Sequence, residues 1–148
     1  MPETVTSLPV ASGRDTIDRE VDCKVRFHEL DPNGHLNHGV YLNLFETARI
    51  EVMERLGLSL PALHARGVHL IVVDVTVRFR RPAVAGDTLT IDSRLGELRP
   101  ASARWHQRMR RGDDHVADAD VRSAVVDADG RPTRPPADLT AAMERLRA

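Results

Sequence analysis

A polar segment around residue 31 contains the residue types needed to attack an activated acyl group. It runs from Asp31 through a Pro-Asn-Gly turn to His38, and an acidic residue, Glu46, follows at helical spacing. A carboxylate can activate water or attack a carbonyl carbon directly. The unpaired N–H groups at a helix start can stabilise the oxyanion that develops. Because a thiolate leaves easily, these two features would suffice to hydrolyse a thioester.

The elements on either side predict how this segment is positioned. Residues 21–27 alternate between apolar and polar side chains, which predicts a half-buried strand. Asp31-Pro32-Asn33-Gly34 is typical of a turn, and Asn37 can cap a following helix that stops at Gly57. Apolar residues recur along this helix at a spacing that gives one stripe: Tyr41, Phe45, Ala48, Val52 and Leu56.

The rest of the chain predicts mostly strands. Ser59 can cap a short helix that ends near residue 65, and alternating runs predict strands over 71–79, 89–95, 101–109 and 116–126. A short amphipathic helix follows over 139–146. The long helix is apolar on several sides, so several sides should be covered. An antiparallel sheet of about five strands curled around that helix, an α+β fold, satisfies this requirement.

Composition bounds the possible classes of protein. The 148 residues suit one domain, predicted over 17–148, after a flexible leader over 1–16 that is rich in Pro, Ser and Thr. A formal net charge of −1 argues against a nucleic-acid partner. A single cysteine, Cys23, excludes an internal disulfide and favours the cytoplasm; on the apolar side of a strand, it is interpreted as a packing residue. No secretory signal and no apolar run long enough to span a membrane is present in the sequence.

The segment from Asp31 to Arg49, D-P-N-G-H-L-N-H-x-x-Y-x-x-x-x-E-x-A-R, resembles the 4-hydroxybenzoyl-CoA thioesterase group of hotdog-fold enzymes. Residues 77–82 and 86–89 are similar to the strand and turn that follow the helix in that group. The resemblance covers roughly residues 21–138. It implies a hotdog fold, with hydrolysis of an acyl-CoA or acyl-carrier-protein thioester and no metal or prosthetic cofactor. It also implies a homodimer or homotetramer with its active sites at a subunit interface.

The same resemblance implies roles for individual residues. Asp31 would be the base or nucleophile, and the backbone N–H of His38 would donate to the thioester oxygen. Asn37 would shape or cap the loop. Glu46 lies where some relatives carry a helix carboxylate that contacts substrate or reacts itself, although an exposed ion pair with Arg49 explains it equally well.

Substrate contacts are expected from two further sets of residues. Tyr41 would line the acyl pocket or pack the helix, and Gly39 lies beside it at the helix start. Arginine binds phosphates well, so the basic run of Arg78, Arg80 and Arg81 could hold the phosphates of CoA. A solvated strand face is the simpler interpretation of that run.

Two other functions remain open at this point. A hydratase or dehydratase of the same fold could exchange protons through His35 and His38, although the His-Phe-Pro start of one such type is not present. A non-catalytic module that binds acyl thioesters is a further alternative. A metal site at His28, His35 and His38 is disfavoured, because their spacing matches no common zinc signature.

Overall fold

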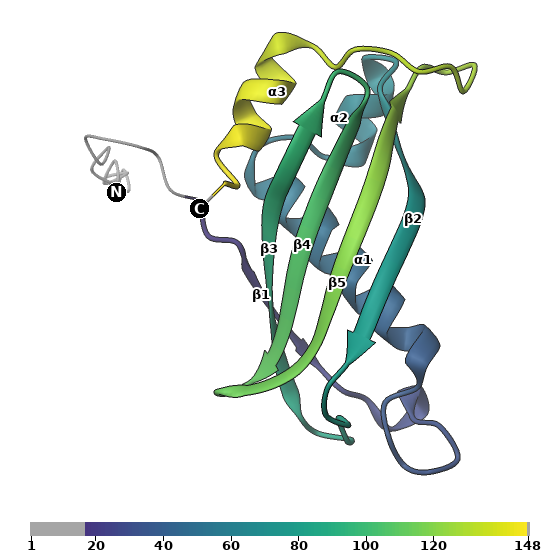
Figure 1. The fold of residues 1–148 in the computed structure, drawn as a ribbon, viewed down its shortest axis with the longest axis vertical. Helices are drawn as coiled ribbons and strands as arrows, with labels where there is room; N and C mark the ends of the chain where they lie inside the picture. The colour runs from purple at the N-terminus through teal and green to yellow at the C-terminus, as the bar shows by residue number, and fades with distance from the viewer. Residues whose placement is uncertain (1–16, 148) are drawn as a thin grey trace, which may run out of the picture.

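The computed structural model describes residues 17–147, in which a curled sheet packs against one long helix (Figure 1). The neighbouring strands of this sheet are antiparallel and lie in the order β1-β3-β4-β5-β2. The elements are β1 (Glu20–Lys24), the 3-10 turn η1 (Phe27–Glu29), α1 (His38–Arg55), α2 (Leu60–Ala65), β2 (His69–Phe79), β3 (Thr88–Arg99), β4 (Ser102–Arg111), β5 (Asp114–Val126) and α3 (Ala137–Glu144). The expected α+β hotdog architecture is therefore confirmed, whereas the expected leader over 1–16 lies outside the described residues.

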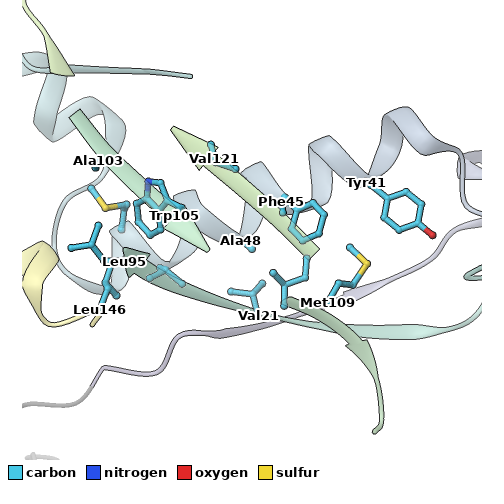
Figure 2. Packing of buried hydrophobic residues seen from close by; sticks show 14 of the residues in the cluster. Val21, Tyr41, Phe45, Ala48, Leu95, Ala103, Trp105, Met109, Val121 and Leu146 are labelled. Carbon is cyan, nitrogen blue, oxygen red and sulfur yellow. The ribbon is translucent and has the colours of Figure 1, made fainter. Parts of the chain in front are cut away.

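Helix α1 begins and ends where its capping residues predict. The Asn37 side chain accepts the Gly39 N–H at 2.9 Å, and Gly57 follows the last turn with a φ of 76°, a left-handed conformation that glycine adopts without strain. The stripe that includes Phe45 and Ala48 is buried against the sheet, opposite Trp105 on β4 (Figure 2). This contact fixes the helix across the concave face of the sheet.

A buried polar network joins α1 to the middle of the sheet. The Arg49 guanidinium donates to Gln107 Oε1 at 2.9 Å, and Gln107 Nε2 donates to Phe45 O and Ser93 Oγ, both at 2.9 Å. Burial lowers the pKa of Arg49, and the nearby charge of Glu46 opposes that effect. The interpretation of Glu46 and Arg49 as an exposed pair is therefore wrong, because Arg49 is buried and donates to Gln107.

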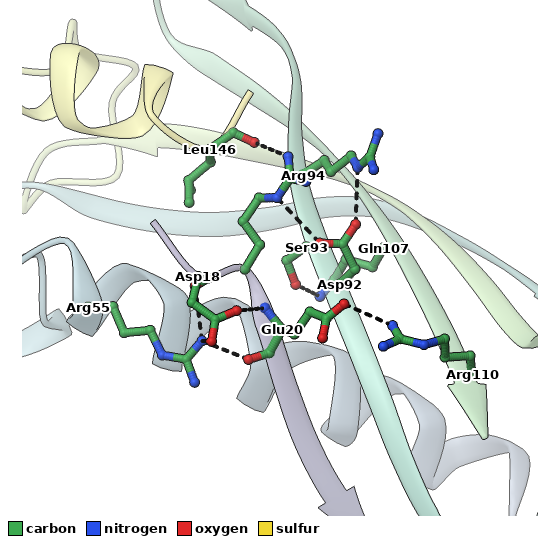
Figure 3. A network of polar contacts seen from close by, with 10 residues as sticks. Asp18, Glu20, Arg55, Asp92, Ser93, Arg94, Gln107, Arg110 and Leu146 are labelled. Carbon is green, nitrogen blue, oxygen red and sulfur yellow. Dashed lines mark hydrogen bonds and ion pairs between the residues drawn. The ribbon is translucent and has the colours of Figure 1, made fainter. Parts of the chain in front are cut away.

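Strand β1 lies at one edge of the sheet, and two arginines bind it: one from helix α1 and one from strand β4. Figure 3 shows Arg55 of α1 donating to the carbonyl oxygens of Asp18 and Glu20, at 3.0 and 2.7 Å. The Glu20 carboxylate also pairs with Arg110 of β4 at 3.1 Å, across β3. These contacts anchor the chain shortly before it enters the loop that contains Asp31.

The first strand is shorter than the alternation predicts. It ends at Lys24, and Phe27 begins η1 with 81% of its surface exposed. The cause is local: the Glu29 side chain accepts the Arg26 N–H at 2.8 Å, while the Arg26 carbonyl accepts the Glu29 N–H at 3.0 Å. This reciprocal pair closes a turn and carries Phe27 away from the sheet.

The alternation over 71–79 predicts that the odd residues all face the core, and this prediction is wrong for the first part of the strand. The pairing of β2 with β5 shifts directly after Val72, which indicates a β-bulge. Before the bulge Val72 lies opposite the buried Ser123, whereas after it Val75 lies opposite the buried Val121. The inward face therefore changes from even to odd residues within one strand.

Strand β2 forms the other edge of the sheet and carries exposed apolar side chains. Ile71, Val72 and Val73 are each about half exposed. Leu42 of α1 is 42% exposed, so one side of the expected all-round apolar helix is uncovered in the single chain. No helix among residues 17–147 is long and apolar enough to cross a bilayer.

Candidate active site

The loop before α1 holds Asp31 in a defined position. Its Oδ1 accepts the N–H groups of Asn33 and His35, at 2.8 and 3.1 Å, and its own N–H donates to His35 O at 2.7 Å. Gly34, with a φ of 76°, closes the turn by donating to Asp31 O at 3.0 Å. The second carboxylate oxygen, Oδ2, has no hydrogen-bond partner among residues 17–147. One oxygen therefore fixes the turn and leaves the other available for chemistry.

The start of α1 leaves one backbone donor available. The Gly39 N–H donates to the Asn37 side chain, and the Val40 N–H donates to Asn37 O at 2.9 Å. The N–H of His38, the first residue of the helix, has no acceptor in the part of the chain that the structure describes. The amide that was expected to bind a thioester oxygen is thus unpaired and lies at the positive end of the helix dipole.

A cavity of about 310 Å³ brings these groups together. It lies between the loop before α1 and the end of β2, and Figure 1 shows where these two segments run. Nine residues line it: Asp31, His35, Leu36, His38, Tyr41, Phe79, Arg80, Arg81 and Pro82. Six of the residues singled out from the sequence are among them: Asp31, His35, His38, Tyr41, Arg80 and Arg81. Asp31 thus faces a cavity rather than only bulk solvent, as a catalytic role requires.

Tyr41 forms a rigid part of the cavity wall. Its side chain is 3% exposed, and its hydroxyl forms a hydrogen bond with the Ala83 backbone. Burial raises the pKa of the hydroxyl, and the negative charge of Asp31 adds to this rise. The hydrogen bond with the Ala83 backbone and the positive charge of Arg111 oppose this rise in the pKa.

Four of the expected site residues do not line this cavity: Asn37, Gly39, Glu46 and Arg78. Asn37 caps the helix, and Gly39 has its N–H occupied by that cap, so neither offers a free donor. Glu46 is exposed further along α1. In the single chain, Asp31 is therefore the carboxylate of the cavity.

The three arginines divide between two faces of the sheet. Arg80 and Arg81 line the cavity, and each also pairs with an aspartate of β5: Arg80 with Asp118 at 3.5 Å and Arg81 with Asp114 at 2.9 Å. Arg78 lies on the outer face of the sheet, in a hollow of about 490 Å³ that Arg80 also lines. It has no ion-pair partner among the described residues. Arg80 therefore connects the candidate site to the outer hollow.

Phe79 belongs to the cavity but was not expected there. Its ring contacts Tyr41 edge to face, with centroids 4.9 Å apart and an interplanar angle of 80°. In the sequence, Phe79 is one of several apolar residues of a strand, so pattern alone assigns it to the core. The available signal was its position at the strand end, directly before Arg80 and Arg81.

Within residues 17–147, no group of three or more His, Cys, Asp or Glu side chains could hold a metal ion.

Comparison with known proteins identifies related sequences. Residues 25–143 match the family model described as the thioesterase-like superfamily. The chain is 37% identical over 79 residues to the long-chain acyl-CoA thioesterase FadM of Escherichia coli K12, a match that covers 53% of this chain and 59% of FadM. It is 29% identical over 105 residues to the acyl-CoA thioester hydrolase YbgC of Escherichia coli O6:H1, covering 70% and 78% of the two chains.

A solved structure extends the likeness to the whole fold. The hypothetical protein TT1821 from Thermus thermophilus superposes with a TM-score of 0.82 and is 32% identical in sequence. The superposition covers 86% of this chain and 98% of that one. The first of the curated relatives is matched over less than two thirds of its own length, whereas the family model spans most of this chain. The chain therefore belongs to the thioesterase-like superfamily.

Proposed function

We propose that the protein is a thioesterase that hydrolyses an acyl-CoA or acyl-carrier-protein thioester to a free acid and a thiol. The observation that carries this proposal is the cavity that contains both Asp31 and the first residue of α1, His38. FadM and YbgC, which are named as acyl-CoA thioesterases, support the same reaction.

In the proposed mechanism Asp31 acts as general base or as nucleophile. As a base, its free oxygen takes a proton from water, and the resulting hydroxide attacks the thioester carbonyl carbon. As a nucleophile, the same oxygen attacks that carbon directly, and water then hydrolyses the anhydride. In both cases the His38 N–H donates to the carbonyl oxygen as negative charge develops there, and the thiolate leaves. The cavity residues named here require no metal or prosthetic cofactor for these steps.

The finer assignments are also proposals. The motif from Asp31 to Arg49 supports a place within the 4-hydroxybenzoyl-CoA thioesterase-like group. The apolar free edge at β2 supports a homodimer or homotetramer, in which Glu46 of α1 would approach the substrate of a neighbouring subunit. The single cysteine supports a cytoplasmic location.

A test of the reaction uses the purified chain and a panel of acyl-CoA and acyl-carrier-protein thioesters. Release of free thiol is expected from at least one thioester, and Asp31→Asn is expected to remove most of it. Asn can still accept the two N–H bonds that Asp31 Oδ1 accepts, so the loop should persist. Circular dichroism checks the fold of the variant. Thiol release that survives Asp31→Asn at the wild-type rate would contradict the proposed role.

We further propose that Arg78, Arg80 and Arg81 bind the phosphates of CoA. Arg78 has no ion-pair partner among residues 17–147, and Arg80 lines both the candidate site and the outer hollow. The substitution Arg78→Ala removes one charge-assisted contact and should raise the KM for an acyl-CoA by about tenfold. The KM for the corresponding acyl-pantetheine, which has no nucleotide, should not change.

The matched control for Arg78→Ala is Arg104→Ala, because Arg104 lies on the same outer face but lines neither cavity. Equal effects of Arg78→Ala on the CoA and pantetheine substrates would show that the arginine acts on the fold and not on the phosphates.

A further inference from the structure

We propose that Phe79 forms, with Tyr41, the wall that contacts the acyl group, and that this wall favours flat aromatic acyl groups over straight chains of equal carbon number. The inference rests on the proposed thioesterase function and names the substrate class of the same site. It is carried by the ring contact between these two residues, by their unequal burial, and by the polar residues that share their cavity.

The two rings meet at one cavity wall although they come from different elements. Tyr41 lies in the first turns of α1, and Phe79 is the last residue of β2. Their edge-to-face contact is a favoured arrangement, because the positive edge of one ring meets the negative face of the other. A third planar ring could extend this arrangement, whereas a flexible chain could not.

Tyr41 holds this wall in place. Its ring is almost completely buried, and its hydroxyl is bound to the Ala83 backbone. Ala83 is buried too, and its carbonyl accepts the Leu36 N–H at 2.8 Å. The ring therefore cannot turn away without breaking contacts in the core.

Phe79, in contrast, has 54% of its surface exposed. A large exposed aromatic side chain beside charged groups in a concave site is a recurring feature of ligand pockets. The cavity also contains the polar residues Asp31, His38 and Arg81. An apolar acyl group would therefore be expected to turn toward Phe79, while its carbonyl carbon remains near Asp31.

The size of the expected preference follows from the ring contact. Aromatic pairs contribute about 0.5–1.5 kcal/mol beyond the area that they bury, which corresponds to roughly a twofold to tenfold preference. Replacing the ring should remove the preference without removing the reaction, because Asp31 and His38 are unchanged.

The test compares kcat/KM for benzoyl-CoA and heptanoyl-CoA, which carry acyl groups of equal carbon number. Phe79→Leu should lower the benzoyl-to-heptanoyl ratio by about fivefold, and Phe79→Tyr should preserve it. Intrinsic differences in thioester reactivity cancel, because each ratio is compared with that of the wild type. Phe27→Ala is the matched control: Phe27 is even more exposed but lines no part of the cavity, so the ratio should stay unchanged.

An unchanged ratio in both Phe79→Leu and Phe79→Ala would overturn the inference. Non-hydrolysable thioether analogues of the two substrates separate this failure from failure of the proposed function. If the wild type hydrolyses no thioester, the proposed function fails. Calorimetry can still measure how tightly each analogue binds to the site that contains Phe79. Tighter binding of the benzoyl analogue that is lost in Phe79→Leu supports the inference, and equal binding of both analogues contradicts it.

Discussion

At the residue scale, the proposed chemistry depends on which atoms of Asp31 and of the first turn of α1 are already hydrogen-bonded and which are not. One oxygen of Asp31 shapes the turn, while the other stays unpaired among the described residues. In the helix, Asn37 satisfies two of the first N–H groups and leaves that of His38. The same side chains that fold the loop therefore determine which atoms remain for a substrate.

The role of the His38 backbone can be separated from that of its imidazole. His38→Ala keeps the N–H and should retain most activity. His38→Pro removes the N–H at the first helical position, where proline is tolerated, and Asn37 already has the extended φ of −62° and ψ of 135° that a residue before proline requires. Thioester hydrolysis by His38→Pro should fall by about 100-fold, the usual cost of losing one oxyanion donor.

Steady-state kinetics of the two variants, with circular dichroism as a check on the fold, gives the answer. If His38→Ala loses as much activity as His38→Pro, the imidazole takes part in the reaction, because both variants lack it and only His38→Ala keeps the N–H. That outcome would favour the proton exchange of a hydratase.

Sequence reasoning reached these residues because their interactions are local. Asp31 bonds to residues within four positions of itself, and Asn37 bonds to Gly39, so a turn signal and a cap signal sufficed. Phe79 could not be found in the same way. Its contact with Tyr41 joins α1 to the end of β2, and only the folded sheet brings those elements together.

At the scale of elements, the strong periodic signals predicted the sheet and helix correctly. Two local features of the strands caused the errors. The alternation around Trp105 and Met109 matches the observed β4. The first strand stopped early because Glu29 captures the Arg26 N–H, a contact that hydrophobic spacing does not reveal. The bulge after Val72 was hidden for a different reason: apolar residues before and after it give no sign of a change of face.

The buried network around Gln107 should be essential to the position of α1 on the sheet. Gln107→Leu removes the acceptor of the buried Arg49 guanidinium and the donor to Phe45 O. Leaving a charged donor without its partner should lower the free energy of unfolding by about 2–3 kcal/mol. Urea unfolding at neutral pH measures the change.

A double variant provides the control for this prediction. Arg49→Met combined with Gln107→Leu removes the stranded charge and should recover part of the lost stability, because two apolar groups of similar size need no partner. If the two single losses simply add in the double variant, the residues do not act as a network.

The whole molecule is asymmetric in how it protects the two edges of its sheet. Strand β1 is held by Arg55 and Arg110, whereas β2 has an unpaired outer edge in the single chain and exposes a run of apolar residues over 71–73. Unprotected apolar edges promote association with another chain. The candidate cavity lies at the end of this same strand, so a partner joined there would approach Phe79.

A second copy of the chain should therefore pair along β2. The double substitution Ile71→Lys with Val73→Lys places charges on this edge and should convert the proposed homodimer to a monomer, as measured by light scattering. Val84→Lys is the matched control, because Val84 is also an exposed valine but lies outside β2. If the interface completes the site, the monomeric variant should also lose thioester hydrolysis while its circular dichroism stays unchanged. A wild-type protein that is monomeric at micromolar concentration, yet fully active, would show that the cavity described in the single chain is sufficient.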